Sequence, residues 1–182
     1  MITGMEVTTR SGHLLALFVE DEVPMLRPIG ETVRLIHELG GLAVVPHPLS
    51  YLTFSVGERV LRELAARRET RVDGIELRNP SYAGRVRATR AEWLNEHVLR
   101  VAATGSSDAH HASLVGTAWT EFDGTAAADL RRAIETRATR PAGRRWTLKE
   151  HLDGAVRQQY RSMLRDPAKR VWRRYVRGGT GR

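Results

Sequence analysis

Residues 42–48 read Leu-Ala-Val-Val-Pro-His-Pro, a short apolar run that leads into a histidine between two prolines. Four consecutive apolar residues are typical of a strand that is buried on both faces of a parallel sheet. Active sites in folds built on such sheets lie at the carboxyl ends of the strands. His47, which follows directly after this run, is therefore a candidate functional residue.

An alternation of strands and helices extends in both directions from this run. Helical spacing of apolar residues predicts helices over 28–39, 56–68, 86–97 and 126–137. Apolar runs predict strands over 2–8, 14–19, 42–45, 74–77, 98–103 and 117–122. This order predicts an α/β architecture with a parallel sheet. A linker is expected over 140–145, and then a helical tail in which Thr147 and Glu150 match a capping box.

Length and composition exclude several classes of protein. The chain has 182 residues, which suits one domain with a short appendage, and 41% of them are hydrophobic, which is enough to form a core. It has no cysteine, so disulfides, thiolate metal sites and cysteine nucleophiles are excluded, and any metal must be held by His, Asp or Glu. The longest apolar run is far shorter than a membrane span, so the default expectation is a soluble cytoplasmic protein.

The net charge of +8 is concentrated in the last quarter of the chain. Residues 1–136 carry 15 basic and 18 acidic side chains, a net charge of −3, whereas residues 137–182 carry 14 and 3, a net charge of +11. The tail combines basic and aromatic residues, namely Arg157, Arg161, Arg165, Arg170, Trp172, Arg173, Arg174, Tyr175 and Arg177. This pattern is compatible with contact to nucleic acid or an anionic surface through 144–177, or with docking of the tail's apolar stripe on the domain.

Side chains that can bind a metal occur at predicted strand ends and turns. They are Glu6, His13, His47 and the run Asp108-Ala109-His110-His111. Each of them alone is more often structural than a ligand. Together, carboxylates and imidazoles without thiolates suit Zn, Mn or Fe at a hydrolytic site. The small residues 105–107 allow Asp108 and His110 to approach a shared site.

Four segments in order resemble the later motifs of the polymerase and histidinol phosphatase (PHP) family of metal-dependent phosphoesterases. They are Gly4-Met5-Glu6-Val7-Thr8-Thr9, Gly12-His13, Pro46-His47-Pro48 and Gly105-Ser106-Ser107-Asp108-Ala109-His110. Residues 73–79 and 114–122 resemble two further strands of that family. The resemblance covers residues 1–139 and implies an incomplete, distorted (β/α)7 TIM-like barrel, with a basic helical extension over 140–182.

The resemblance also implies a site with two or three divalent metals, Zn, Mn or Fe. Glu6 would bridge two metals, and His13 and His47 would complete the ligands of one of them. Asp108 would bind the neighbouring metal and His110 a third, whereas His111 has no counterpart in the family.

Two arginines, Arg10 and Arg78, are weak candidates for binding the phosphate, because a guanidinium matches phosphate oxygens geometrically. The alternative for each is an ordinary solvated arginine on the surface.

The His-x-His and Thr-Asp-His motifs at the start of PHP proteins have no counterpart in this sequence. Three explanations are open. The chain is a fragment or a mis-started reading frame of a longer PHP protein, or a natural short form that is inactive or uses one metal, or it obtains the missing part from another chain. A family motif encoded in frame upstream of Met1 would establish the first.

The expected function is hydrolysis of a phosphate ester by metal-activated water, impaired if half of the ligands are absent. The substrate would be a phosphorylated small molecule or a nucleic-acid end, and activity should fall in acid because ligating histidines must be neutral. The alternative is a non-catalytic PHP-like module that binds nucleic acid or an anionic surface through its basic tail. A PHP-like domain that serves a polymerase is a weaker alternative, because nothing here resembles the rest of a polymerase.

Overall fold

The computed structural model of the protein describes residues 1–153. Its strands are β1 (Gly4–Thr9), β2 (Gly12–Leu17), β3 (Leu42–Val45), β4 (Gly74–Arg78), β5 (Ala102–Gly105), β6 (Ala118–Glu121) and β7 (Arg140–Gly143). Its α-helices are α1 (Ile29–Glu38), α2 (Glu58–Ala65), α3 (Ala88–Leu94) and α4 (Ala127–Glu135). Shorter helical turns are η1 (Arg68–Thr70), η2 (Asn95–Leu99) and η3 (Ala112–Leu114), and a further helix begins at residue 148.

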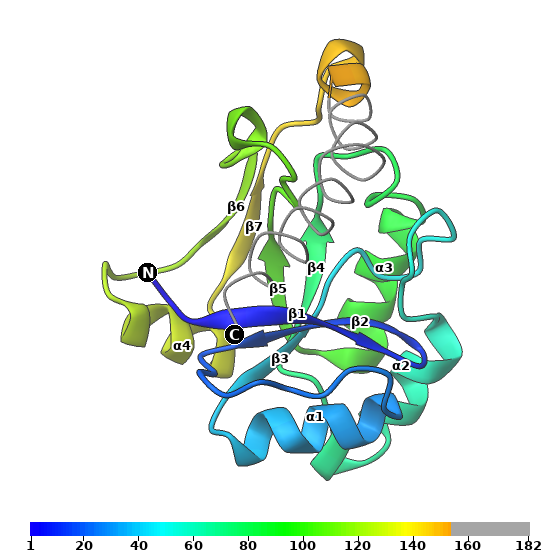
Figure 1. Ribbon diagram of the computed structural model, residues 1–182, viewed down its shortest axis with the longest axis vertical. Helices are drawn as coiled ribbons and strands as arrows, with labels where there is room; N and C mark the ends of the chain where they lie inside the picture. Colours follow the sequence, from blue (N-terminus) through cyan, green and yellow to red (C-terminus); the bar gives the residue numbers. More distant parts are fainter. Residues whose placement is uncertain (154–182) are drawn as a thin grey trace, which may run out of the picture.

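Five strands form one mixed sheet in the order β1-β2-β3-β4-β5 (Figure 1). The pairs β1/β2 and β2/β3 are antiparallel, whereas β3/β4 and β4/β5 are parallel. The strands β6 and β7 pair with each other in a separate antiparallel ribbon. The three parallel strands therefore bring their carboxyl ends to one edge of the sheet.

The expected incomplete (β/α)7 TIM-like barrel is wrong. Strands of such a barrel are parallel and close on themselves, but the two residues between β1 and β2 form a hairpin turn, and a turn this short joins only antiparallel strands. The strand β2 is also antiparallel to β3. Within residues 1–153 the sheet is open, with β1 and β5 as its outer strands.

Most of the expected elements are present, with shifted ends. The alternating order from the first strand to the fourth helix is confirmed, but the strand expected over 98–103 lies at Ala102–Gly105. The expected linker over 140–145 is wrong, because its first four residues form β7 and pair with β6. The Thr147 capping box is confirmed, since the Glu150 amide donates to the Thr147 hydroxyl (3.3 Å) and the Thr147 amide donates to the Glu150 carboxylate (2.7 Å).

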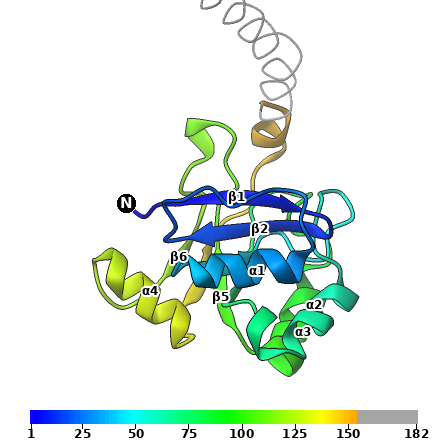
Figure 2. The same cartoon turned by 60° about the horizontal axis from the view of Figure 1, so that its bottom comes forward.

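The main core lies between the sheet and the helices α1, α2 and α3, which Figure 2 shows together on one side of the hairpin. Each helix contributes its apolar stripe. Fully buried examples are Val33 and Ile36 from α1, Leu61 from α2, and Leu94 from α3. The helix α4 packs Ile134 into a smaller cluster with Leu42 and Ala102. The helices thus cover one face and leave the strand ends open for a site.

The hairpin has two faces of different character because side chains alternate along a strand. Val7 and Leu14 are opposite each other and buried in the core. Glu6 and His13 lie on the other face, two positions apart in register, and are partly accessible to solvent. Gly12 makes the tight turn with φ +129°, and a Cβ there would lie 2.5 Å from the Val56 amide nitrogen. The turn is thereby pressed against the loop that follows β3.

No helix in residues 1–153 is both long enough and apolar enough to span a membrane. The predicted basic and aromatic tail residues from Arg157 onward lie outside the described residues.

Candidate metal centre

Two parts of the fold bring the predicted ligands together. Glu6 and His13 project from the open face of the β1–β2 hairpin, and His47 lies directly after β3. Asn79 follows β4, and Ser106 and Asp108 follow β5 at the same edge of the sheet. The parallel order of β3, β4 and β5 makes these positions neighbours although they are far apart in sequence.

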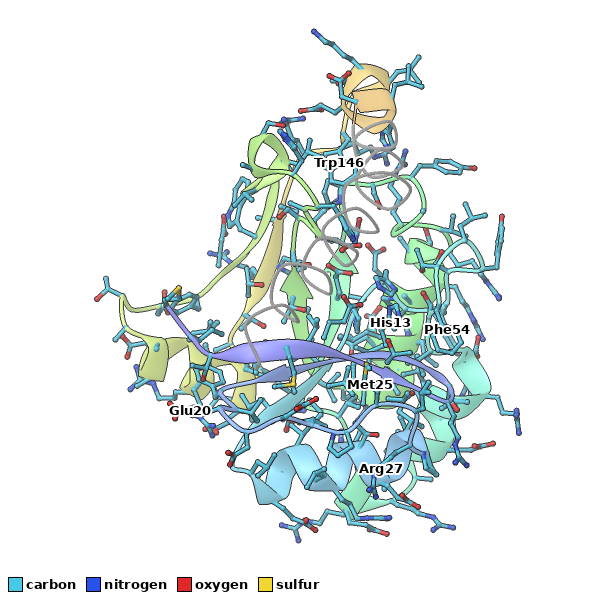
Figure 3. All side chains as sticks on the ribbon, in the orientation of Figure 1. His13, Glu20, Met25, Arg27, Phe54 and Trp146 are labelled. Atoms are coloured by element: carbon cyan, nitrogen blue, oxygen red, sulfur yellow. The ribbon has the colours of Figure 1, made fainter. Side chains whose placement is uncertain are left out.

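Glu6, His13 and His47 converge on one point. The Glu6 Oε1 atom lies 2.8 Å from His13 Nδ1 and 3.7 Å from His47 Nε2, and the imidazole rings meet edge to face with their centroids 5.5 Å apart. One ligand atom from each residue lies within 4.8 Å of the others. Figure 3 shows His13 beside Phe54, whose ring contacts it edge-on at 5.5 Å. Three of the five predicted ligands are thus close enough to share one ion.

The contact between Glu6 and His13 supports a cation at this point. Although the two atoms are 2.8 Å apart, they lack hydrogen-bond geometry, so the buried His13 Nδ1 has no hydrogen-bond partner among residues 1–153. Buried polar atoms without partners are rare in folded proteins. A carboxylate oxygen and an imidazole nitrogen are suitable ligands for Zn or Mn. The residues present therefore fit a divalent metal.

Hydrogen bonds fix the orientation and tautomer of His47. The Ser55 hydroxyl donates its only proton to the His47 carbonyl oxygen (2.5 Å). It must therefore accept from His47 Nδ1, which lies 2.9 Å away. This leaves the lone pair of the neutral ring on Nε2, the atom that faces Glu6. A histidine held in this way through its other nitrogen is the usual arrangement of a metal ligand.

A buried carboxylate, Glu76 on β4, holds the backbone around the centre. It accepts hydrogen bonds from the His47 amide (2.5 Å), from Asn79 Nδ2 (3.2 Å) and from the Ser106 hydroxyl. Glu76, His47 and Asn79 are all at most 5% exposed. One side chain therefore ties together the ends of β3, β4 and β5.

Two of the predicted ligands have strained backbones. His47 has φ +31° and Asp108 has φ +46°, in the region that residues other than glycine rarely adopt. Each such conformation costs of the order of 1–3 kcal/mol and is maintained only by surrounding contacts. For His47 those contacts are the bonds of its amide to Glu76 and of its carbonyl to Ser55. Strain of this kind is concentrated at functional sites.

Glu6 and His47 shift each other's pKa in the directions expected for a carboxylate beside a protonated imidazole. The interaction with the His47 ring, whose Nε2 lies 3.7 Å from Glu6 Oε1, lowers the pKa of Glu6, and burial opposes the shift only in part. Burial lowers the pKa of His47, but the interaction with Glu6 and the charges of Asp108 and Glu76 outweigh it, so the pKa of His47 is raised. The cluster therefore favours positive charge next to Glu6.

Asp108 and His110 lie next to the triad but do not join it in the described residues. Burial raises the pKa of Asp108, and His47, His110 and Glu6 all act on it electrostatically, so these groups share one environment. His110 Nδ1 lies 3.1 Å from the Asp108 carbonyl oxygen and 3.9 Å from its carboxylate. His111 accepts from the Ser113 amide and caps η3, which gives it a structural role.

The structure adds no support for phosphate binding by Arg10 or Arg78. Arg10 lies in the hairpin turn, where its Nε donates to the Leu26 carbonyl oxygen (2.9 Å). This bond ties the hairpin to the following loop and leaves the Nε–H group unavailable to a phosphate. Arg78 ends β4 and is exposed, and nothing in the described geometry singles it out.

Sequence reasoning missed the groups that support the ligands. Ser55 and Thr53 carry no recognisable signal, because single hydroxyls in a loop are common. Glu76 did carry one, since it is the only charged residue in Gly74-Ile75-Glu76-Leu77, a run predicted to be a buried strand. A charge in a buried strand is expected to have several hydrogen-bond partners.

Comparison with known proteins agrees with the family resemblance. A family described as PHP-associated matches residues 94–139, a segment that includes Asp108 and His110, and this match supports a relationship of the chain to the PHP family. The chain is also similar to a Methanocaldococcus jannaschii protein described as "Uncharacterized protein MJ1587", with 32% identity over 79 residues. That alignment covers 43% of this chain and 42% of the relative's length.

Proposed function

We propose that the protein hydrolyses phosphate esters at a centre in which Glu6, His13 and His47 hold a divalent metal. The observation that carries the proposal is the convergence of three ligand atoms within 4.8 Å, from a hairpin and from the end of a separate strand. The match to a PHP-associated family supports it, because the motifs resemble those of metal-dependent phosphoesterases. Asp108 and His110 are proposed as ligands at neighbouring metal positions.

The residues of the chain have distinct parts in this chemistry. A bound divalent metal supplies an activated water and positive charge for the phosphoryl oxygens. Glu6 contributes a carboxylate whose side chain is 44% exposed, so the centre is open to substrate. His47 presents Nε2 in the neutral tautomer, and Ser55 prevents the ring from turning. Thr53 donates to Ser55 (2.6 Å) and completes this support.

Hydrolysis of 4-nitrophenyl phosphate by the full chain tests the proposal. We expect release of 4-nitrophenol with Mn²⁺, Zn²⁺ or Fe²⁺ and no release after chelation. Glu6→Gln should abolish both activity and metal loading, because the amide is a much weaker ligand than the carboxylate.

The control is Glu63→Gln, which changes an exposed carboxylate on α2 and should leave the rate unchanged. Absence of hydrolysis with all three metals would refute the proposed activity. Retained hydrolysis and full metal content in Glu6→Gln would refute the role of Glu6.

The alternative of a basic binding module gains no support from the described residues. Within 144–153, Arg144 is bound by Glu150 through two hydrogen bonds of 2.8 and 2.6 Å. The predicted stripe of Arg157, Arg161 and Arg165 lies outside the described residues.

A further inference from the structure

A cavity of about 330 Å³ opens beside the candidate metal centre. Asp108 and His110 form part of its lining, and so does Thr53, whose hydroxyl lies 3.2 Å from His47 Nδ1. The volume is at the lower end of the range for small-molecule sites. An ester with its phosphate at the metal centre would have its organic group next to this cavity.

The cavity wall away from the predicted ligands is apolar and partly aromatic. Leu52, Leu114 and Trp146 line it, together with Ala83. Leu52 and Trp146 are far apart in the sequence, in the loop after β3 and in the segment after β7. Figure 3 shows Trp146 near the end of that segment, below the helix that begins at 148.

Two hydrogen bonds hold Trp146 in place, one from its indole ring and one from its backbone. Its ring Nε1 donates to the Thr117 hydroxyl (2.8 Å), and its backbone amide donates to the Pro80 carbonyl oxygen (3.0 Å). The side chain therefore does not have to be ordered when a ligand binds, and a preorganised wall increases affinity.

His151 forms the adjoining part of the wall. Its Nε2 accepts from the Tyr82 amide (2.8 Å), so Nδ1 carries the proton and donates to the Thr147 carbonyl oxygen (2.9 Å). The neutral ring meets Trp146 edge to face at 5.4 Å. Both nitrogens are occupied, so His151 contributes a ring surface to the cavity.

We propose that this cavity binds the organic group of the phosphate ester and selects alcohols that carry a flat aromatic or heteroaromatic ring. The inference rests on the proposed function for its catalytic part. Two fixed aromatic rings and two leucines offer an apolar surface on which a planar ring can stack, at about 0.5–1.5 kcal/mol per favourable ring pair beyond its burial. Thr53 and Ser81 also line the cavity, and because their hydroxyl protons are donated to Ser55 and Asn79, each hydroxyl can serve a ring heteroatom only as an acceptor.

Two esters with alcohols of similar acidity separate ring recognition from leaving-group chemistry. We expect the full chain to hydrolyse 2-phenylethyl phosphate with a kcat/KM about 10- to 100-fold above that for ethyl phosphate. Trp146→Ala should reduce this ratio at least about fivefold. The matched control Trp119→Ala removes an indole that is 47% exposed and outside the cavity, and it should retain the ratio.

A second variant tests the cavity even if Trp146→Ala fails to fold, and a binding measurement tests it without catalysis. Ala83→Phe should block the cavity and reduce the ratio without disturbing the backbone, since Ala83 is bonded within the described residues through its carbonyl oxygen, which accepts from the Ser50 hydroxyl and the Val86 amide. Saturation-transfer NMR with 2-phenylethanol should detect ring contact in the full chain, and both cavity variants should lose it.

Ring binding that is lost in both cavity variants, without hydrolysis of either ester, would support the pocket and refute the proposed function. Hydrolysis with a ratio near one, or a ratio that neither cavity variant changes, would overturn the pocket.

Discussion

Replacement of Glu76 by leucine should strongly destabilise the fold, although none of the proposed metal ligands is replaced. The substitution removes the acceptor for the His47 amide and for Asn79 Nδ2, both of which are buried. A buried donor left without a partner costs about 1–3 kcal/mol. Two such donors predict a loss of roughly 2–6 kcal/mol, reduced somewhat because the buried carboxylate is no longer desolvated.

Glu76→Gln should be milder, because one amide oxygen can still accept from His47 and Asn79. The Ser106 hydroxyl can rotate and accept from the new amide group. We expect a loss of about 1 kcal/mol or less. Mutation of a residue that hydrogen-bonds to a metal ligand typically weakens metal affinity by about 10- to 100-fold. We therefore expect Glu76→Gln to weaken metal binding about tenfold or more.

Urea unfolding of the two variants and of Glu63→Leu tests this reasoning. Glu63 is 60% exposed, so its replacement removes a carboxylate without leaving buried donors. If Glu76→Leu lost no more stability than Glu63→Leu, the network would not hold the strand ends as described.

Two further variants test other parts of the fold. Hydrogen bonds from Arg90 and a second arginine lower the pKa of Glu58 to about 2, so its ion pairs stabilise the fold above pH 4.5 and lose effect as the pH falls towards 2. Glu58→Gln should therefore remove at most about 1 kcal/mol of stability near pH 6 and almost none near pH 2, and equal losses in urea unfolding at both would contradict this. Gly12→Ala places a Cβ 2.5 Å from the Val56 amide at φ +129°, so we expect a loss of roughly 2 kcal/mol or more. Gly57→Ala, with open space around its Cβ, should lose less than about 1 kcal/mol, and similar midpoints for both alanine variants would refute the steric argument.

The order of strands and helices was predictable from the sequence. The antiparallel direction of β1 and β2 was not predicted, because a parallel barrel was expected. The apolar runs and helical spacing mark each element, and the Ser11-Gly12 pair marks a turn. Two strands joined by so short a turn must be antiparallel, which is incompatible with the start of a parallel barrel. The family resemblance implies a parallel barrel, whereas the short turn of this hairpin makes β1 and β2 antiparallel.

The identity of the candidate ligands was predictable from the sequence, but their arrangement in space was not. Motif order pointed to Glu6, His13 and His47, but only register and strand order show that a hairpin and a strand end meet there. The hydrogen bonds that orient these ligands depend on which hydroxyl donates and which accepts, as with Ser55 and His47. No sequence spacing reveals this. Trp146 lies outside the motifs and reaches the cavity only because β7 returns the chain to this edge.

The most direct test of the metal centre is equilibrium binding of Mn²⁺ or Zn²⁺ to the full chain and to His13→Gln. His13 is a good target because its buried Nδ1 has no hydrogen bond to lose within residues 1–153. The control is His97→Gln, which changes a half-exposed histidine stacked on Trp93. The structure predicts that His13→Gln loses a metal ion that the wild-type chain and His97→Gln both retain. Equal stoichiometry and affinity in all three proteins would contradict a metal centre at Glu6, His13 and His47.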